Sequence, residues 1–173
     1  MRKLCSISIL LFFLASLFVG CSSTAVNKSQ TNISSKEQSI NLYFSDSNAE
    51  YLVGEKRQIK DVTPEKAIQA LIEGPQNKEL TSTLPKELEV SKVSIQDGIA
   101  YVYIHESVPL DKHGNYGSST ATMFIINSIS TTLILHEPFG IKKVKLEGDI
   151  NDLLYGVDTN ELHEVNMNLI KRK

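Results

Sequence analysis

The chain is poor in cysteine and has no tryptophan: among its 173 residues only Cys5 and Cys21 carry a thiol. Cys5 lies inside an apolar N-terminal segment, and Cys21 lies directly after that segment. If the segment is removed on export, Cys21 is the one cysteine that stays in the mature chain. This scarcity excludes a disulfide framework, a cysteine-based metal site and thiol catalysis in the domain that follows.

An excess of positive charge is also missing. The formal net charge is −2 at pH 7, and it becomes about −4 if Arg2 and Lys3 are lost with the signal. Domains that bind nucleic acid carry a basic patch, and here basic residues gather only at 142–145 and 171–173. We interpret these two groups as a solvated strand face and a soluble tail, so we expect no nucleic acid among the partners.

Residues suited to metal binding or catalysis are few. None of the four histidines has a ligand spacing such as His-x-x-x-His, which is the pattern that places two imidazoles on one helix face. We therefore expect neither a metal nor a cofactor. His136 falls at the end of a predicted helix, where a partly protonated imidazole would suit the negative end of the helix dipole, and we interpret it as structural.

The segment Asp111–Gly117 carries the chemical alternatives. Asp111 and Glu106 could form a carboxylate pair for glycan hydrolysis. His113 could serve a weak peptidoglycan-acting enzyme or a wall-ligand receptor, since loops often carry sites. The run Gly114–Gly117 precedes a predicted helix and could bind an anion there, but it has no phosphate-loop lysine. We favour a solvated loop and assign no catalytic residue.

What the sequence does contain is a secretion signal. Arg2 and Lys3 precede an apolar run from Leu4 to Val19, which is the order of a signal peptide with its basic end on the cytoplasmic side. The run is shorter than the roughly 20 residues that a membrane-spanning helix needs. We predict a signal peptide over residues 1–20 and favour it over a retained transmembrane anchor.

The residues at the end of this signal resemble a lipobox. Gly20 and Cys21 match its last two positions, with Leu17 and Phe18 before them. In lipoproteins the cysteine receives a diacylglycerol before cleavage, and the two acyl chains of that group are sufficient for stable membrane anchoring. We therefore expect lipid attachment at Cys21, palmitate being one such chain, and a location on the extracytoplasmic face of the cell membrane.

The mature chain is predicted to have three parts. Residues 21–38 are polar and without apolar period, which is typical of a flexible tether. Residues 39–160 carry the alternating and helical patterns of one folded domain. Residues 161–173 are expected to form a polar C-terminal tail.

Within the domain, the patterns predict a fold of class α+β. In chain order, we expect a strand at 40–44, a short edge hairpin at 51–59, a helix at 63–73, strands at 88–95 and 99–105, a longer helix from about 118 to 136, a strand at 141–147 and a short closing piece at 153–155. Thr63 and Pro64 begin the first helix and Gly74 ends it, while Asp97-Gly98 is a strong hairpin signal. The order β-α-β-β-α-β suggests two helices on one face of a small sheet, leaving the other face open.

The open face is the candidate interface. Tyr43 on the first strand and Tyr101 and Tyr103 on a later one share the polar-facing parity. If those strands are neighbours, the three rings form one aromatic patch, and tyrosine is a residue typical of interfaces. The alternative is that these tyrosines only reflect strand propensity.

Several segments in this order resemble the GerMN domain. The resemblance rests on 40–46, 63–75, 93–104 and 139–146, and its most specific parts are the helix end Leu-Ile-Glu-Gly-Pro at 71–75 and the hairpin Asp-Gly-Ile-Ala at 97–100. It implies a cell-envelope protein linked to sporulation or spore germination, with a fold similar to the ring-building motif of secretion-like assemblies. It supplies no catalytic residue.

Together these features favour a non-catalytic binding or assembly module, anchored to the membrane through its lipid. The expected partner is an envelope protein or peptidoglycan, and self-assembly is a further alternative. The enzyme or receptor at the His113 loop is the competing hypothesis. A solute receptor is the least favoured, because one domain of this size lacks the two lobes that close around a ligand.

Overall fold

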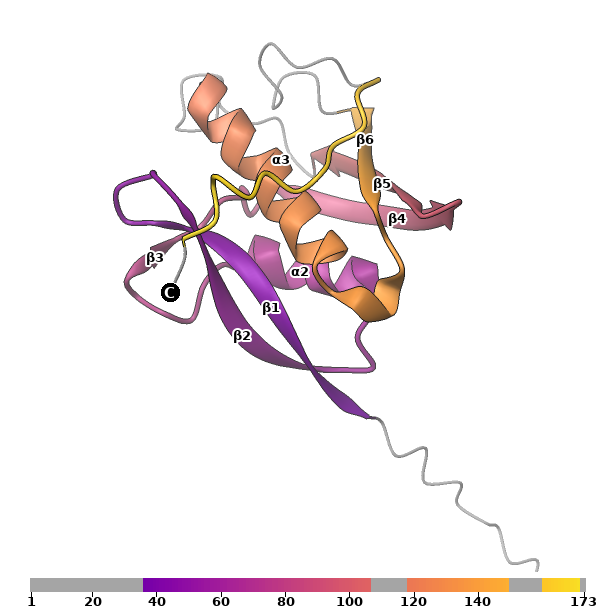
Figure 1. Cartoon of the computed structure of the whole chain (residues 1–173), viewed down its shortest axis with the longest axis horizontal. Coiled ribbons are helices and arrows are strands. Elements are labelled where there is room, and N and C mark those ends of the chain that lie inside the picture. Colours follow the sequence, from indigo (N-terminus) through magenta and orange to yellow (C-terminus); the bar gives the residue numbers. More distant parts are fainter. Residues whose placement is uncertain (1–35, 107–117, 150–159, 172–173) are drawn as a thin grey trace, which may run out of the picture. The chain divides into compact units, whose positions relative to one another are not determined.

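The computed structural model describes residues 36–106, 118–149 and 160–171 (Figure 1). The expected α+β class and the two helices are confirmed. The strands, however, form two three-stranded sheets rather than one small sheet. The first sheet has the order β2-β1-β3 and the second has the order β4-β5-β6.

The first sheet is built on a long hairpin. β1 (Glu37–Asp46) pairs antiparallel with β2 (Leu52–Lys60) along its whole length, so the expected short edge hairpin is in fact a full strand pairing. β3 (Leu80–Thr81) pairs only with Ser45 and Asp46 at the end of β1. Among the described residues, most of the second edge of β1 therefore has no strand beside it.

A carboxylate closes the turn between β1 and β2. Asp46 Oδ1 accepts hydrogen bonds from the N–H groups of Glu50, at 2.9 Å, and Tyr51, at 3.2 Å. The bond from Glu50 is the largest of the effects that lower the pKa of Asp46, and burial opposes it. Asp46 therefore stays ionised and fixes the chain reversal that the Asp-Ser-Asn run predicts.

The helix α2 (Pro64–Glu73) begins and ends as expected. The side chain of Thr63 accepts the N–H of Lys66, and proline fills the first helical position, where its missing N–H costs nothing. Gly74 follows with φ of 89°, a conformation that favours glycine. The buried face of α2 consists of Ala67, Ile68, Ala70, Leu71 and Ile72.

In the second sheet, β4 (Leu88–Gln96) pairs antiparallel with β5 (Ile99–Glu106), and β5 pairs parallel with β6 (Lys143–Asp149). Asp97 and Gly98 both have positive φ, of 53° and 77°. A two-residue hairpin turn of this type requires that conformation at both positions. The Asp-Gly turn is therefore confirmed.

Two local features shape the second sheet. The register of β4 shifts between Val90 and Lys92, which confirms the irregular strand that the opposite parity of Val90 and Val93 suggests. In β6, a Cβ atom at Gly148 would lie 1.9 Å from the carbonyl oxygen of Ile104. Only glycine lets β6 come this close to β5.

The helix α3 (Ser119–Ile134) also follows the sequence prediction. The Ser118 side chain caps it by accepting the N–H of Ala121 at 3.1 Å, and the short helix η1 (Glu137–Phe139) ends in Gly140 with φ of 66°. The many isoleucine and threonine residues of α3 have low helix propensity. Burial compensates for this, since ten of its residues are buried.

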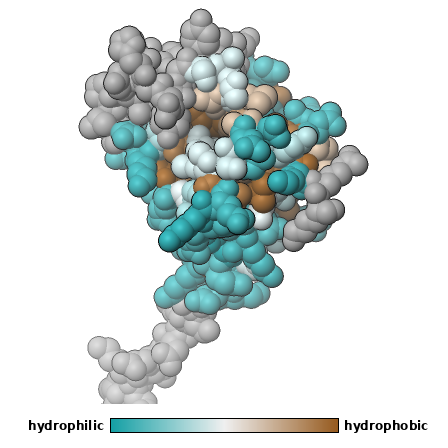
Figure 2. Space-filling view, turned by 90° about the vertical axis from the view of Figure 1, so that its left-hand side faces the viewer, coloured by the Kyte–Doolittle hydropathy of each residue, from teal (hydrophilic) through white to brown (hydrophobic). Residues whose placement is uncertain are grey.

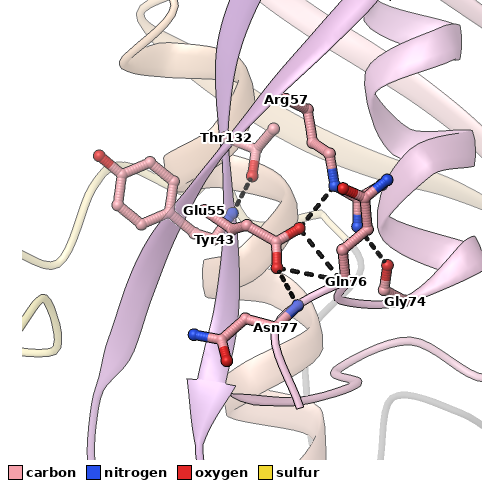
Figure 3. A network of polar contacts seen from close by, with 7 residues as sticks. All are labelled: Tyr43, Glu55, Arg57, Gly74, Gln76, Asn77 and Thr132. Carbon is pink, nitrogen blue, oxygen red and sulfur yellow. Dashed lines mark hydrogen bonds and ion pairs between the residues drawn. The ribbon is translucent and has the colours of Figure 1, made fainter. Parts of the chain in front are cut away.

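The middle of α3 is tied to β1 by side-chain hydrogen bonds. Thr132 Oγ1 accepts the backbone N–H of Tyr43 at 3.1 Å (Figure 3). One helical turn earlier, the Ser128 hydroxyl donates to the carbonyl oxygen of Tyr43 and accepts from Thr83 Oγ1 at 2.7 Å. The helix thus supplies the hydrogen-bond partners that a neighbouring strand would give to the N–H and C=O groups of Tyr43.

The core lies where the two sheets and the two helices meet. α2 contacts both β1 and β4, and α3 contacts both β1 and β6, so the helices join the two sheets (Figure 1). The largest fully buried side chains of the core include Ile40, Leu42, Phe44, Ile68, Leu71, Leu84, Leu88, Ile104, Ile125, Ile129 and Leu133. One hydrophobic cluster therefore contains side chains from both sheets.

The segment 160–171 differs from the expected polar tail. His163 and Val144 exchange backbone hydrogen bonds of 2.7 and 2.9 Å at the edge of β6. Further along, the N–H of Leu52 in β2 donates to the carbonyl of Leu169 at 2.7 Å, and the Leu169 side chain is buried. This segment therefore belongs to the folded domain and joins an edge of each sheet.

Candidate binding surface on the second sheet

The second sheet has one buried and one accessible face. Along β5, the side chains of Ala100, Val102 and Ile104 are buried, while Tyr101 and Tyr103 lie on the opposite face and are partly exposed. Strand residues alternate between faces, so the alternation seen in the sequence is confirmed. We call the accessible face the tyrosine face.

Tyr103 lies between a lysine and a glutamate. In the sheet register it stands beside Lys92 of β4 and Glu147 of β6. The Lys92 ammonium lies 5.9 Å from the centroid of the Tyr103 ring, within reach of a cation–π contact. The Tyr103 hydroxyl donates a hydrogen bond to the Glu147 carboxylate. The hydroxyl and the face of this ring are therefore each contacted by a neighbouring strand.

Tyr101 lies one row away on the same face. Its register neighbours are Ser94 in β4 and Lys145 in β6. Lys145 Nζ forms an ion pair of 3.1 Å with Glu147 Oε1, and each of these two side chains is 24% exposed. This ion pair connects the row of Tyr101 to the row of Tyr103.

The charges of this face stabilise its hydrogen bonds at neutral pH. The hydrogen bond to Glu147 is the largest of the effects that raise the pKa of Tyr103 above its ordinary value. The same bond, followed by the one from Lys145, lowers the pKa of Glu147. Tyr103 therefore stays a protonated donor and Glu147 an ionised acceptor, which is the stronger form of such a bond.

A contact between an exposed histidine and an exposed glutamate borders the tyrosine face. His105 of β5 lies opposite Glu89 of β4, with 3.2 Å between Nε2 and Oε2. Their side chains are 44% and 59% exposed, so solvent screens the pair and it contributes little to stability. It adds a polar rim to a surface that has aromatic rings at its centre.

Tyr43 does not join this surface, because its strand is not a neighbour of β5, which was the condition for a single aromatic patch. Tyr43 lies on β1 in the first sheet, whereas Tyr101 and Tyr103 lie in the second. Its ring packs against a cluster of Leu52, Phe124 and Leu169, and burial raises its pKa. The periodicity gave the right parity for each tyrosine but could not show that the strands belong to different sheets.

His136 does not have the environment of the partly charged residue that its position suggested. The His136 ring packs edge-on against Phe139, with centroids 4.5 Å apart, and burial lowers its pKa. The neutral imidazole is therefore favoured at pH 7, and the expected stabilisation of the helix dipole is wrong. Burial similarly lowers the pKa of His163.

Some predicted positions lie outside the described residues. Cys21 and the signal 1–20, together with Asp111, His113 and the run 114–117, belong to segments that the structure does not describe. The same holds for the closing piece at 153–155 and the side chain of Glu106. Their assignments remain predictions from the sequence.

Within the described ranges, no group of three or more histidine, cysteine, aspartate or glutamate residues is placed to hold a metal ion. No described helix is long and apolar enough to cross a membrane.

Figure 2 shows the side that carries the β1–β2 hairpin. Among its described residues, hydrophilic side chains dominate the lower part and hydrophobic ones form small patches.

A polar network in the first sheet was not predicted from the sequence (Figure 3). The Glu55 carboxylate accepts hydrogen bonds from Arg57 Nε and from the N–H groups of Gln76, at 3.0 Å, and Asn77, at 2.7 Å. Arg57 also donates to the carbonyl of Gly74 at 2.8 Å. These bonds hold the segment after α2 against β2. Their partners are about 20 residues apart, so no local pattern reveals them.

Known proteins share this sequence pattern and fold. The Germane family model, described as sporulation and spore germination, matches residues 41–149. A search of curated protein sequences found no match to the chain. The solved tandem GerMN domains of the sporulation protein GerM from Bacillus subtilis superpose with a TM-score of 0.59, at 16% identity, over 84% of this chain and 51% of that one.

The first GerMN domain of the same Bacillus subtilis protein superposes with a TM-score of 0.52, at 23% identity, over 65% of this chain and 83% of that one. This chain thus spans about half the length of the tandem-domain structure. The two likenesses show a shared fold, and the family match covers more than half of the sequence. This chain belongs to the Germane family of sporulation and spore germination.

Proposed function

We propose that this protein is a lipid-anchored, non-catalytic binding module on the extracytoplasmic side of the cell membrane. It acts in sporulation or spore germination by presenting the tyrosine face to an envelope partner. The family supports the process. The basic start, the apolar run and the Gly20-Cys21 pair support the location and the lipid anchor.

The observation that carries the binding role is the fixed geometry of Tyr103. Its hydroxyl is bonded to Glu147 and its ring lies near the Lys92 ammonium, although the face is accessible to solvent. A side chain held in place before binding loses little conformational freedom in a complex. Aromatic rings with a polar end are typical of residues that dominate interface energies.

Photo-crosslinking in intact cells tests the binding role. A photoreactive amino acid at position 92 lies beside Tyr103 on the tyrosine face, and one at position 58 lies on an exposed part of β2. We expect a discrete crosslinked product from position 92 that position 58 does not give. The same products from both positions, or none from position 92, would contradict the proposal.

Mass spectrometry of the purified mature protein tests the anchor separately. We expect an N-terminal peptide that begins at Cys21 and carries at least two acyl chains. Cys21→Ser should release the protein from the membrane fraction or leave it unprocessed. An unmodified Cys21 in a processed, membrane-bound chain would contradict the lipid anchor. This result would not bear on the binding role of the tyrosine face.

A further inference from the structure

β1 has a free edge at Ser39 and Asn41. On one side it pairs with β2 throughout, whereas on the other side β3 reaches only Ser45 and Asp46. Tyr43 has its backbone partners on α3. Among the described residues, nothing else pairs with this edge of β1.

The direction of the backbone groups follows from Tyr43. Its N–H and C=O point to α3 and therefore away from β2. In an antiparallel pair every second residue points the same way, so the N–H and C=O groups of Ser39 and Asn41 also point away from β2. Both residues are exposed. These are four hydrogen-bonding groups aligned for another strand.

A groove of about 390 Å³ lies along this edge. It is lined by Ser39, Ile40, Asn41, Lys56, Leu135 and His136. Thr132 touches β1 at Tyr43, and one turn later Leu135 and His136 are the far side of the groove. The gap between the helix and the strand therefore closes at Tyr43 and opens towards Ser39.

Within the part of the chain that the structure describes, the groove is not protected against strand addition. Natural sheets guard an exposed edge with a proline, a bulge or a covering segment. Over 37–45 the pairing of β1 with β2 is regular, and β1 contains no proline. The edge residues Ser39 and Asn41 are uncharged.

We propose that this edge binds an extended acidic peptide segment of a partner protein, which adds to β1 as a further strand. Of the described residues that line the groove, Lys56 alone has a permanent charge. Among the described residues, no carboxylate pairs with it. The added strand obtains affinity from the backbone groups of Ser39 and Asn41, and Lys56 selects a carboxylate on it. This site is separate from the tyrosine face, so it does not rest on the proposed function.

Binding of a synthetic peptide to the whole chain in detergent tests the site. The probe is a fluorescent heptapeptide of alternating valine and aspartate, blocked at both ends. We expect saturable binding, and hydrogen–deuterium exchange of the segment 37–44 should slow in the complex. The same peptide with lysine in place of aspartate should bind at least about tenfold more weakly, because a repelled charge replaces an attracted one.

Proline variants separate the free edge from the rest of the sheet. Ser39→Pro removes a donor on the free edge and keeps the bonds to β2, since proline is tolerated where the strand N–H faces outward. Gln58→Pro is the matched control: it lies opposite Ser39, on the outer edge of β2. Ser39→Pro should weaken binding about tenfold or more, while Gln58→Pro should change it less than about twofold.

Lys56→Gln should weaken binding of the aspartate peptide several-fold and reduce its dependence on salt. Equal binding by Ser39→Pro, or equal binding of the lysine peptide, would overturn the proposal. A third result would also overturn it: the chain self-associates, Ser39→Pro abolishes this self-association, and the peptide does not bind. The occupant of the edge would then be a second copy of the chain. If Ser39→Pro does not fold, unchanged exchange of segment 37–44 in the wild type with peptide would also overturn it.

Discussion

The Tyr103 hydroxyl donates a hydrogen bond to the Glu147 carboxylate across the parallel pair of β5 and β6. Lys145 reaches the same carboxylate from two residues away on β6. One carboxylate thus fixes the orientation of a tyrosine and a lysine on an accessible sheet face. The arrangement stabilises a surface geometry more than it stabilises the fold, since surface ion pairs contribute little to folding.

Tyr103→Phe tests this relationship. The ring remains but the donor is lost, so the pKa of Glu147 should rise towards its ordinary range. A pH titration of the Glu147 carboxylate by NMR measures the change, and the melting temperature should move by less than about 3 °C. Tyr101→Phe is the control, and it should leave the pKa of Glu147 nearly unchanged. An equal rise in both variants would contradict the hydrogen bond.

Thr132→Val tests the link between α3 and β1. The variant keeps the side-chain shape but leaves the N–H of Tyr43 without its partner, which should lower the free energy of unfolding by about 1–3 kcal/mol. Chemical denaturation measures this loss. The control is Ser130→Ala on the same helix. Ser130 Oγ is buried without a hydrogen-bond partner among the described residues, so its removal should be neutral or stabilising. Equal losses would contradict the assigned network.

Glu55→Gln tests the network that holds the segment after α2. Burial is the largest effect on Glu55 and raises its pKa, but the N–H groups of Asn77 and Gln76 and the Arg57 guanidinium together lower it below its ordinary value. A depressed pKa contributes stability above the unfolded pKa and loses it as the pH falls through the folded one. At pH 7 the variant should lose about 1.5–3 kcal/mol.

The difference between wild type and Glu55→Gln should therefore shrink as the pH falls below the ordinary glutamate range. Urea denaturation between pH 7 and pH 3 gives this curve. Glu73→Gln is a suitable control, because Glu73 is exposed at the end of α2. A difference that is constant across the range would show that the charge of Glu55 does not act through these hydrogen bonds.

Leu169→Ala tests whether the segment 160–171 belongs to the domain. Leu169 is 8% exposed and packs with Leu52 and Phe124, so the truncation should cost about 2–4 kcal/mol. Met167, two residues earlier, is 58% exposed, and Met167→Ala should change stability by less than about 0.5 kcal/mol. Thermal unfolding compares the two. Equal effects would favour the polar tail expected from the sequence.

Features set by neighbouring residues were predictable. Thr63 and Pro64 begin α2, and Asp97-Gly98 forms the hairpin turn, because capping and turn chemistry depend on a few consecutive residues. The α+β class also followed from the order of strands and helices. The family resemblance rested on the same segments.

Features set by distant residues were not predictable from the pattern. Period two gave Tyr43 and Tyr103 the right parity, but it carries no information on which sheet a strand joins. The pattern places Leu169 in a polar tail, because one apolar residue among polar ones has no period. On β6, the alternation of Lys143, Lys145 and Glu147 does indicate a shared face, and it was the one sequence signal for the charges beside the tyrosines.

Binding of a partner to the tyrosine face is best tested by an affinity measurement. The partner identified by crosslinking from position 92 is purified and titrated against wild type and the Tyr101→Ser, Tyr103→Ser double variant. We predict that the double variant binds at least about tenfold more weakly, since interface tyrosines often contribute more than 1 kcal/mol each, and that its melting temperature stays within about 3 °C. Unchanged affinity in a folded double variant would contradict the binding role of the tyrosine face.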